Sequence, residues 1–230
     1  MNIIEKEKAL DYLRSGKIII FPTETSYGLG CDATNQQAVD KIFKIKGRRG
    51  DKPLLVIVPT IEMAKEYLEW NDLLEKIATK YWFTRRSPSE GGPGPLTVVG
   101  MSLRGSRFAS ADEAIPMGSP HPLLRGVRDD RLASGVVSKD KTIAVRVTNA
   151  EIPKYLSEQL GRPVVATSAN LADLGDVYSG EELIKMYEGR EIQPDAIINA
   201  GILPSNPPTT IVSVVGGELK VLRQGEVKVV

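Results

Sequence analysis

The feature that most constrains the fold is a short apolar run followed at once by a dense polar stretch. Residues 18–21 are three isoleucines and a phenylalanine, and this length predicts a buried β-strand rather than an independent helix. Pro22 lacks a backbone N–H, so we expect the strand ladder to stop there. Residues 23–28 then bring three hydroxyls, a carboxylate and a phenol. Such a strand end is where open α/β sheets bind ligands, although a capped turn before a loop remains an alternative.

The rest of the chain alternates between strand and helix patterns. Helices are expected at 5–15, after Asn35, at 61–69, 72–81 and 152–160, and from Ser179 to about 187, and strands at 17–22, 53–58, 95–99, 142–147, 163–167, 196–199, 210–215 and 218–223. A Gly-Gly turn separates the last two strands. This alternation predicts an α/β domain with one mixed, twisted sheet.

Charge and cysteine content narrow the function classes. The 230 residues include 30 Lys and Arg against 29 Asp and Glu, and the net charge of +1 argues against a protein that coats nucleic acid through its overall field. Cys31 is the one cysteine of the chain, which excludes an internal disulfide and fits the reducing cytoplasm, where we expect the protein. We expect Cys31 to be a buried packing residue. No membrane span or signal peptide is expected.

A cluster of cations follows the second helix. Lys44, Lys46, Arg48, Arg49 and Lys52 place five positive charges in nine residues. Cations at a helix C-terminus can simply face water, or they can clamp a polyphosphate. The chain has no Gly-x4-Gly-Lys-Ser/Thr loop, His-Glu-x2-His or Cys-x2-Cys motif. A nucleotide site would therefore rely on side-chain cations, hydroxyls and strand-end amides.

Two stretches break the pattern and are interpreted as a loop-rich insertion in a single domain covering 1–230. Residues 83–92 are rich in Arg, Ser, Pro and Gly, and about 101–138 show no sustained periodicity, most clearly over 101–131. The interpretations left open are a flexible loop, an ordered lid, a plug in the cavity or an error in the sequence.

The motifs together resemble the YrdC/Sua5 family. The stretch 22–30, followed by Asp32-Ala33 and Lys46-Gly47-Arg48, carries the resemblance, which covers roughly 15–100 and 139–225. It implies a YrdC-like fold, in which a twisted mixed sheet and helices surround a basic concave cavity. It also implies a nucleotidyltransferase that makes threonylcarbamoyl-adenylate and pyrophosphate from L-threonine, bicarbonate or CO2, and ATP, for the threonylcarbamoyl-adenosine modification of tRNA. Mg²⁺ would enter with the nucleotide rather than at a protein metal site, and a threonylcarbamoyl transferase complex would use the product.

The resemblance also implies roles for individual residues. It assigns Lys46, Arg48, Ser168 and Asn170 to catalysis, Thr25, Tyr27, Arg146 and Thr209 to threonine binding, and Lys46, Arg48, Lys52, Thr142, Ser168, Asn170 and Arg223 to ATP binding. Three departures matter: Lys52 replaces a frequent Asn, Ile57 replaces a His of longer members and favours the short type, and Asp176 and its neighbours replace a Ser-Pro-Thr segment. A protein that binds tRNA or double-stranded RNA, and an inactive homologue of the same fold, remain alternatives.

Overall fold

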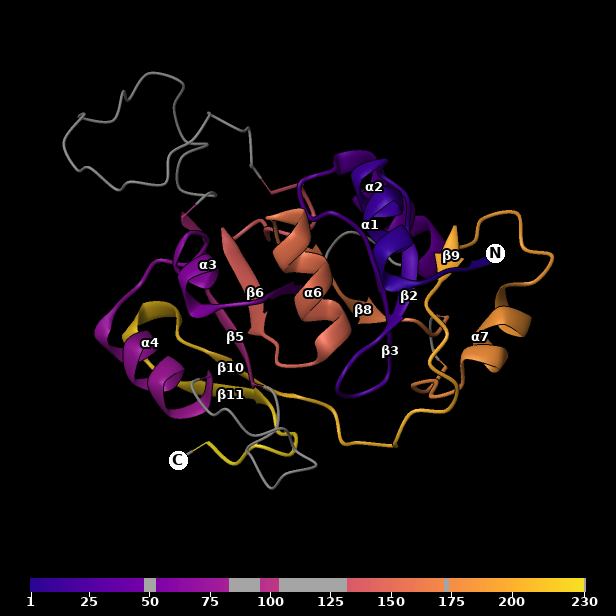
Figure 1. Ribbon diagram of the computed structural model, residues 1–230. Helices are drawn as coiled ribbons and strands as arrows, with labels where there is room; N and C mark the ends of the chain where they lie inside the picture. Colours follow the sequence, from indigo (N-terminus) through magenta and orange to yellow (C-terminus); the bar gives the residue numbers. More distant parts are fainter. Residues whose placement is uncertain (48–52, 83–95, 104–131, 172–173, 230) are drawn as a thin grey trace, which may run out of the picture.

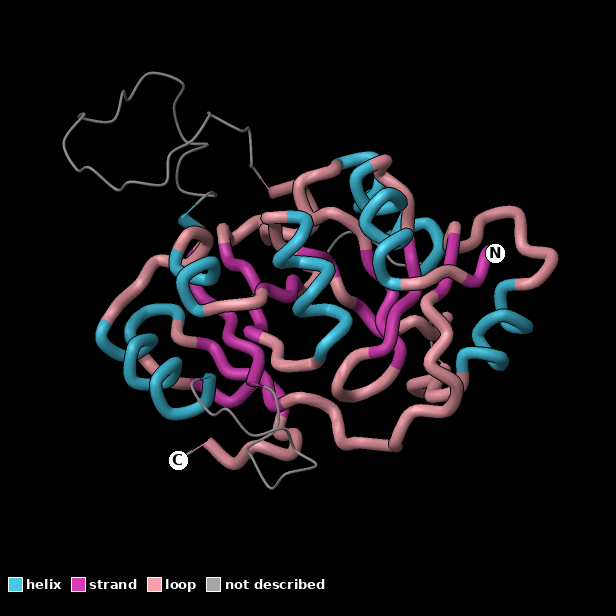
Figure 2. The backbone as a smooth tube through the Cα atoms, in the orientation of Figure 1, coloured by secondary structure: helices cyan, strands magenta, loops and turns pink. Residues whose placement is uncertain are grey.

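The computed structural model describes residues 1–47, 53–82, 96–103, 132–171 and 174–229. Their strands form two mixed sheets, one of five strands in the order β1-β9-β2-β3-β8 and one of six in the order β11-β10-β5-β6-β4-β7. Figures 1 and 2 show the two sheets side by side, with the chain termini at opposite ends of the molecule. The α/β class is confirmed, but the expected single sheet is two sheets.

The five-stranded sheet is organised around a hairpin. Its strands are β1 (Asn2–Ile3), β9 (Ala196–Ile197), β2 (Ile19–Pro22), β3 (Tyr27–Gly30) and β8 (Thr167–Ser168). As expected, Pro22 is the last residue of β2, and it pairs with Tyr27. The Thr23 N–H donates to the Ser26 carbonyl at 3.0 Å. Antiparallel pairs alternate between bonded and non-bonded, so Pro22 and Tyr27 form a non-bonded pair whose backbone groups point away from each other's strand. A proline is tolerated there because no donor is needed.

The six-stranded sheet consists of β11 (Lys220–Arg223), β10 (Thr210–Ser213), β5 (Leu96–Met101), β6 (Thr142–Val147), β4 (Val56–Val58) and β7 (Val164–Val165). The strand predicted at 163–167 explains why there are two sheets. Its first half, β7, pairs with β4, and its second half, β8, pairs with β3 of the other sheet. The chain changes sheet at Ala166, which brings the edges of the two sheets together.

The helices are α1 (Lys6–Arg14), α2 (Gln36–Lys46), α3 (Ile61–Lys65), α4 (Asp72–Ile77), α6 (Glu151–Leu160) and α7 (Gly180–Tyr187), with a π-helix at Ala78–Trp82 after α4. Predicted caps are confirmed: the Asn35 side chain accepts from the Ala38 N–H, and Gly161 ends α6 at φ 68°. Helix α3 ends earlier than predicted because Tyr67 and Glu69 pair their backbones with Leu103 and Met101.

Two apolar clusters hold the layers together. In the smaller one, Leu13 of α1 and Leu156 of α6 pack with Phe21 of β2 and Ile57 of β4. Helix α6 therefore contacts both sheets across their junction (Figure 1). The Ile57 side chain, which stands where longer family members have a His, is fully buried in this cluster, as is typical of an isoleucine. The larger cluster fills the space between the sheets, α2 and α7.

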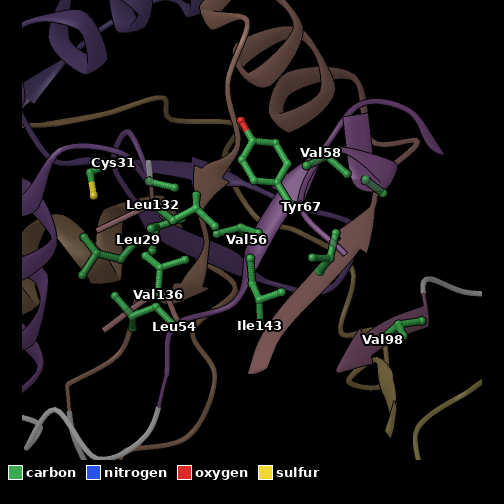
Figure 3. Close-up of a cluster of buried hydrophobic side chains, with 14 of the residues drawn as sticks. Leu29, Cys31, Leu54, Val56, Val58, Tyr67, Val98, Leu132, Val136 and Ile143 are labelled. Carbon is green, nitrogen blue, oxygen red and sulfur yellow. The ribbon is translucent and has the colours of Figure 1, made fainter. Parts of the chain in front are cut away.

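The larger cluster also corrects one boundary of the predicted insertion. Leu132, Ala133 and Val136, assigned to the loop-rich stretch, are buried beside Leu29 and Leu54 (Figure 3). This apolar island is too short to show a period, yet backbone bonds from Ala133 to Ala33 and from Leu54 to Gly135 place it in the core. Met101 is likewise the last residue of β5, paired with Thr142, and Ser102 forms an isolated bridge with Leu68. The calls on 83–92 and on the centre of the insertion lie outside the described residues.

Candidate functional site

A cavity of about 210 Å³ opens where the two sheets meet. It is lined by residues of the β2–β3 hairpin, of β6, of the β7–β8 segment and of the strands β10 and β11, namely Thr23, Thr25, Ser26, Tyr27, Gly28, Leu55, Arg146, Ala166, Thr167, Ser168, Asp176, Pro208, Thr209, Ile211 and Arg223. The polar stretch recognised in the sequence thus meets elements that lie more than a hundred residues away along the chain.

The hairpin loop is held by its own hydroxyls. The Thr23 hydroxyl donates to the Ser26 carbonyl at 2.7 Å and accepts from the Thr25 N–H at 3.3 Å. The Asn206 side-chain amide donates to the Glu24 carbonyl at 2.9 Å, which ties the loop to the chain before β10. The loop therefore presents Thr25 and Ser26 to the cavity from a fixed backbone.

Arg146 supplies a buried positive charge to the cavity. The side chain is 7% exposed, and its Nη1 lies 3.7 Å from Oε1 of Glu24, which is 9% exposed. Among the described residues, no group accepts a hydrogen bond from the Arg146 Nε–H. A buried guanidinium with spare donors costs free energy unless a ligand accepts from it, so this wall is suited to an anion.

A second arginine faces the same cavity but is mostly engaged. The Arg223 guanidinium donates from Nε and Nη2 to the Thr209 carbonyl at 3.0 and 2.8 Å, and from Nη2 to the Thr209 hydroxyl at 3.0 Å. Burial and the nearby Arg146 charge lower the pKa of Arg223, and Asp176 partly opposes this. The Thr209 hydroxyl also lies 3.3 Å from that of Thr97. The cavity therefore combines two guanidinium groups with one carboxylate.

Lys46 ends α2 and is held at the edge of this cavity. Its Nζ donates to the carbonyls of Ser168 and Asn170 at 2.8 and 2.5 Å, and to the Asn170 side-chain oxygen at 2.6 Å. The Ser168 hydroxyl, which lines the cavity, donates to the same Asn170 oxygen at 2.6 Å. The predicted group of Lys46, Ser168 and Asn170 is thus brought together, with the ammonium bonded to protein oxygens.

Other predicted residues fall differently. Tyr27 lines the cavity, but its hydroxyl donates to the Gly201 carbonyl and accepts from the Ala200 N–H, both at 2.9 Å, and burial raises its pKa. Thr142 does not line the cavity, and its hydroxyl lies 2.8 Å from that of Ser138.

Arg48 and Lys52 lie outside the described residues. Cys31 is buried as expected, which raises the pKa of its thiol.

Two functional candidates were not assigned from the sequence. Glu24 lies 3.7 Å from Arg146, and the Thr148 hydroxyl lies 3.1 and 3.2 Å from the two Glu24 oxygens. Thr148 follows Arg146 by two residues in extended chain, so strand alternation could have identified it as a same-side neighbour. Asp176, noted only as a departure, lines the cavity.

Other kinds of site are not found in the described part of the chain. Its Cys, Asp and Glu residues form no group that could hold a metal ion. Its helices include none that is both long and apolar enough to span a membrane.

Comparisons with known proteins agree with this architecture. Threonylcarbamoyl-AMP synthase of Pyrococcus abyssi is 29% identical over 221 residues, covering 94% of this chain and 53% of that protein. The synthase of Psychromonas ingrahamii is 28% identical, covering 90% of this chain and 91% of its own. The crystal structure of P. abyssi Sua5 complexed with L-threonine superposes with a TM-score of 0.73 at 27% identity, covering 98% of this chain and 57% of that chain.

The family assignment rests on the length of the match. This chain spans about half of the P. abyssi protein but nearly all of the Psychromonas one. The model of the Sua5/YciO/YrdC family, described as "telomere recombination", matches residues 11–225, which include both sheets except β1 and every residue that lines the cavity. The chain belongs to the Sua5/YciO/YrdC family.

Proposed function

We propose that this protein is an L-threonylcarbamoyladenylate synthase, a nucleotidyltransferase that uses L-threonine, bicarbonate or CO2, and ATP. The observation that carries the proposal is the buried Arg146 guanidinium, which has an unused Nε–H donor and faces a small cavity rich in hydroxyls. An α-carboxylate is the group that such a guanidinium binds best. The relatives named threonylcarbamoyl-AMP synthase, and one solved with L-threonine, support the same substrate.

The reaction needs no protein nucleophile. The threonine amine adds to CO2 and loses a proton to give a carbamate, whose oxygen attacks the α-phosphorus of ATP while pyrophosphate leaves. The protein must hold the reactants together, offset the charge of the phosphates and keep water from the labile carbamate. The cavity between the sheets presents hydroxyls and two guanidinium groups that suit the first two of these tasks.

The proposed roles combine the family resemblance with the positions of the side chains around the cavity. Arg146 would bind the threonine carboxylate, and Thr25 or Thr209 the substrate hydroxyl. The Ser168 hydroxyl would contact the nucleotide, with Lys46 and Asn170 holding it in place. From the family resemblance, Arg48 and Lys52 remain proposed phosphate ligands, and Mg²⁺ would arrive with ATP. Arg223 would bind the nucleotide, and its bonds to Thr209 would connect the nucleotide side of the cavity to the threonine side.

The decisive experiment incubates the purified chain with L-threonine, ATP, Mg²⁺ and labelled bicarbonate, and detects threonylcarbamoyl-adenylate by mass spectrometry. Valine is the matched control, because it has the shape of threonine but lacks the hydroxyl. Sites that bond a hydroxyl reject such analogues by several orders of magnitude. Product from threonine alone supports the proposal. A folded protein that makes no product would overturn it and favour the inactive-homologue alternative.

Supply of the adenylate to a tRNA-modifying transferase complex belongs to the same proposal. Direct binding of tRNA is the alternative from the sequence, and the net charge of +1 does not favour it. A gel-shift assay with tRNA at two salt concentrations tests that alternative separately from the synthase activity.

A further inference from the structure

We infer that Glu24 and Thr148 form a positioning pair that orients the Arg146 guanidinium for an α-carboxylate ligand; this rests on the proposed function and adds to it. The three side chains form a continuous series. The Ala150 N–H donates to the Thr148 hydroxyl at 3.1 Å, that hydroxyl donates to the Glu24 carboxylate, and the carboxylate faces Arg146 Nη1 at 3.7 Å.

The position of Glu24 argues against direct contact with the ligand. Its neighbours Thr23 and Thr25 line the cavity, whereas Glu24 does not. The Glu24 carbonyl is fixed by the Asn206 amide and its carboxylate by Thr148, so both ends of the residue are held. The carboxylate therefore contacts the guanidinium from outside the cavity lining, where it can orient the N–H donors of Arg146 without occupying the ligand site.

The distances indicate which N–H donors of Arg146 the Glu24–Thr148 pair leaves available to a ligand. At 3.7 Å, the Glu24 oxygen offers charge compensation but not a short hydrogen bond. The Nε–H of Arg146 finds no acceptor among the described residues. Because the Nε atom is itself buried, the donor capacity for an incoming carboxylate lies at the Nη end of the side chain, where the 3.7 Å contact with Glu24 is the one ion pair found in the described structure. Removing the Glu24 charge would leave a buried cation uncompensated, free to turn toward other oxygens.

The test is a double-mutant cycle on the full chain with Glu24→Gln and Arg146→Lys, read out as the Kd for L-threonine by calorimetry. We expect Glu24→Gln to raise this Kd roughly tenfold when Arg146 is present and by less than about twofold in the Arg146→Lys background, as coupled neighbours do. The KM for ATP should not change. Equal effects in both backgrounds, or a parallel rise in the KM for ATP, would overturn the inference in favour of a purely structural role.

A second variant covers the case in which Glu24→Gln does not fold. Thr148→Val removes the hydroxyl at constant shape and should raise the threonine Kd, and Thr148→Ser should restore it. Failure of Thr148→Ser to restore binding would count against the pair. Glu151→Gln is the matched control, because it removes a carboxylate only five residues from Arg146, but one that is exposed, paired with Lys6 and not part of the cavity lining.

A ligand-free readout separates this inference from the proposed function. The Arg146 Nε–H resonance, assigned by its loss in Arg146→Lys, reports whether the guanidinium is rigid. We expect Glu24→Gln to reduce its heteronuclear NOE. An unchanged NOE would overturn the positioning role even if the synthase activity is present, whereas wild-type protein that binds no threonine would overturn the proposed function.

Discussion

Lys46 and Arg146 are both buried cations close to the same cavity, yet their surroundings differ. The Lys46 ammonium donates to three protein oxygens of the Ser168–Asn170 segment at 2.8 Å or less. The Arg146 guanidinium has one carboxylate at 3.7 Å and an Nε–H without an acceptor in the described structure. Burial by itself therefore does not distinguish a binding residue from a structural one; unused donor capacity does.

This difference in hydrogen-bond partners indicates different roles for the two cations. Lys46 connects the end of α2 to β8 and the segment after it, so its charge stabilises the wall that carries Ser168. Arg146 lies on β6 in the other sheet, and its charge remains available to a ligand. The cavity thus has one wall on which Lys46 is fully engaged by protein oxygens and another on which Arg146, unlike Arg223, is not.

The largest expected effect comes from Arg146→Lys. The substitution keeps a positive charge beside Glu24 but removes the planar fork of donors. Loss of the charge-assisted bonds to a carboxylate should cost about 2–4 kcal/mol, or roughly 30-fold to 1,000-fold in kcat/KM for threonine. Steady-state kinetics with threonine varied at saturating ATP provides the measurement. Wild-type kcat/KM in this variant would remove Arg146 from the threonine site.

Lys46→Met should reduce stability, in contrast to Arg146→Lys. Without the ammonium, the oxygens of Ser168 and Asn170 lose their donor inside the protein, and we expect the free energy of unfolding to fall by about 3 kcal/mol. Urea denaturation of both variants checks this contrast, and the midpoint for Arg146→Lys should stay close to that of the wild type. If Lys46→Met were as stable as the wild type, the ammonium would not hold this wall.

Tyr187→Phe tests whether a second side chain besides Lys46 holds the segment of Ser168 and Asn170. The Tyr187 hydroxyl donates to the Ala169 carbonyl at 2.8 Å, between the two residues that Lys46 holds. We expect the variant to lose about 1–2 kcal/mol, because that carbonyl is left without this donor. Equilibrium denaturation at pH 7 gives the value, and unchanged stability would show that Lys46 holds the segment without help.

The pH dependence of the same variant is a separate test. Burial raises the pKa of Tyr187 from 10.0 to about 12. Below pH 10 the phenol is neutral in both states and its contribution to stability is complete. Between pH 10 and 12 the unfolded state ionises first, so stability falls as the pH rises. Wild-type stability should drop more steeply than that of Tyr187→Phe over this interval, and parallel curves would contradict the assignment.

Glu151→Gln has the smallest expected effect. Glu151 and Lys6 form a 2.6 Å ion pair. The pair lowers the pKa of Glu151 and raises the pKa of Lys6, but the Glu151 side chain is 79% exposed. Exposed pairs contribute little, because water and salt screen them. We expect no measurable change in melting temperature or in kcat/KM. A clear loss of activity would show that an exposed charge outside the cavity lining matters, and it would weaken the comparison between Lys46 and Arg146.

Several features were determined by the sequence because they depend on near neighbours. The apolar run at 18–21 is a buried strand, Asn35 and Ser179 cap helices, and Gly161 ends one, since each signal involves residues within four positions. The polar stretch at 23–28 does line a cavity, and the family resemblance is confirmed by the match over 11–225.

Only the tertiary structure decided which groups meet and how they are satisfied. Lys46 finds its acceptors 122 and 124 residues further along the chain, and Arg146 meets a glutamate from the β2–β3 loop of the other sheet. The division of 164–168 between two sheets and the burial of Leu132 and Val136 were likewise invisible. Periodicity reports which face of an element is apolar, but donor and acceptor pairing depends on how distant elements pack, and that information is not local.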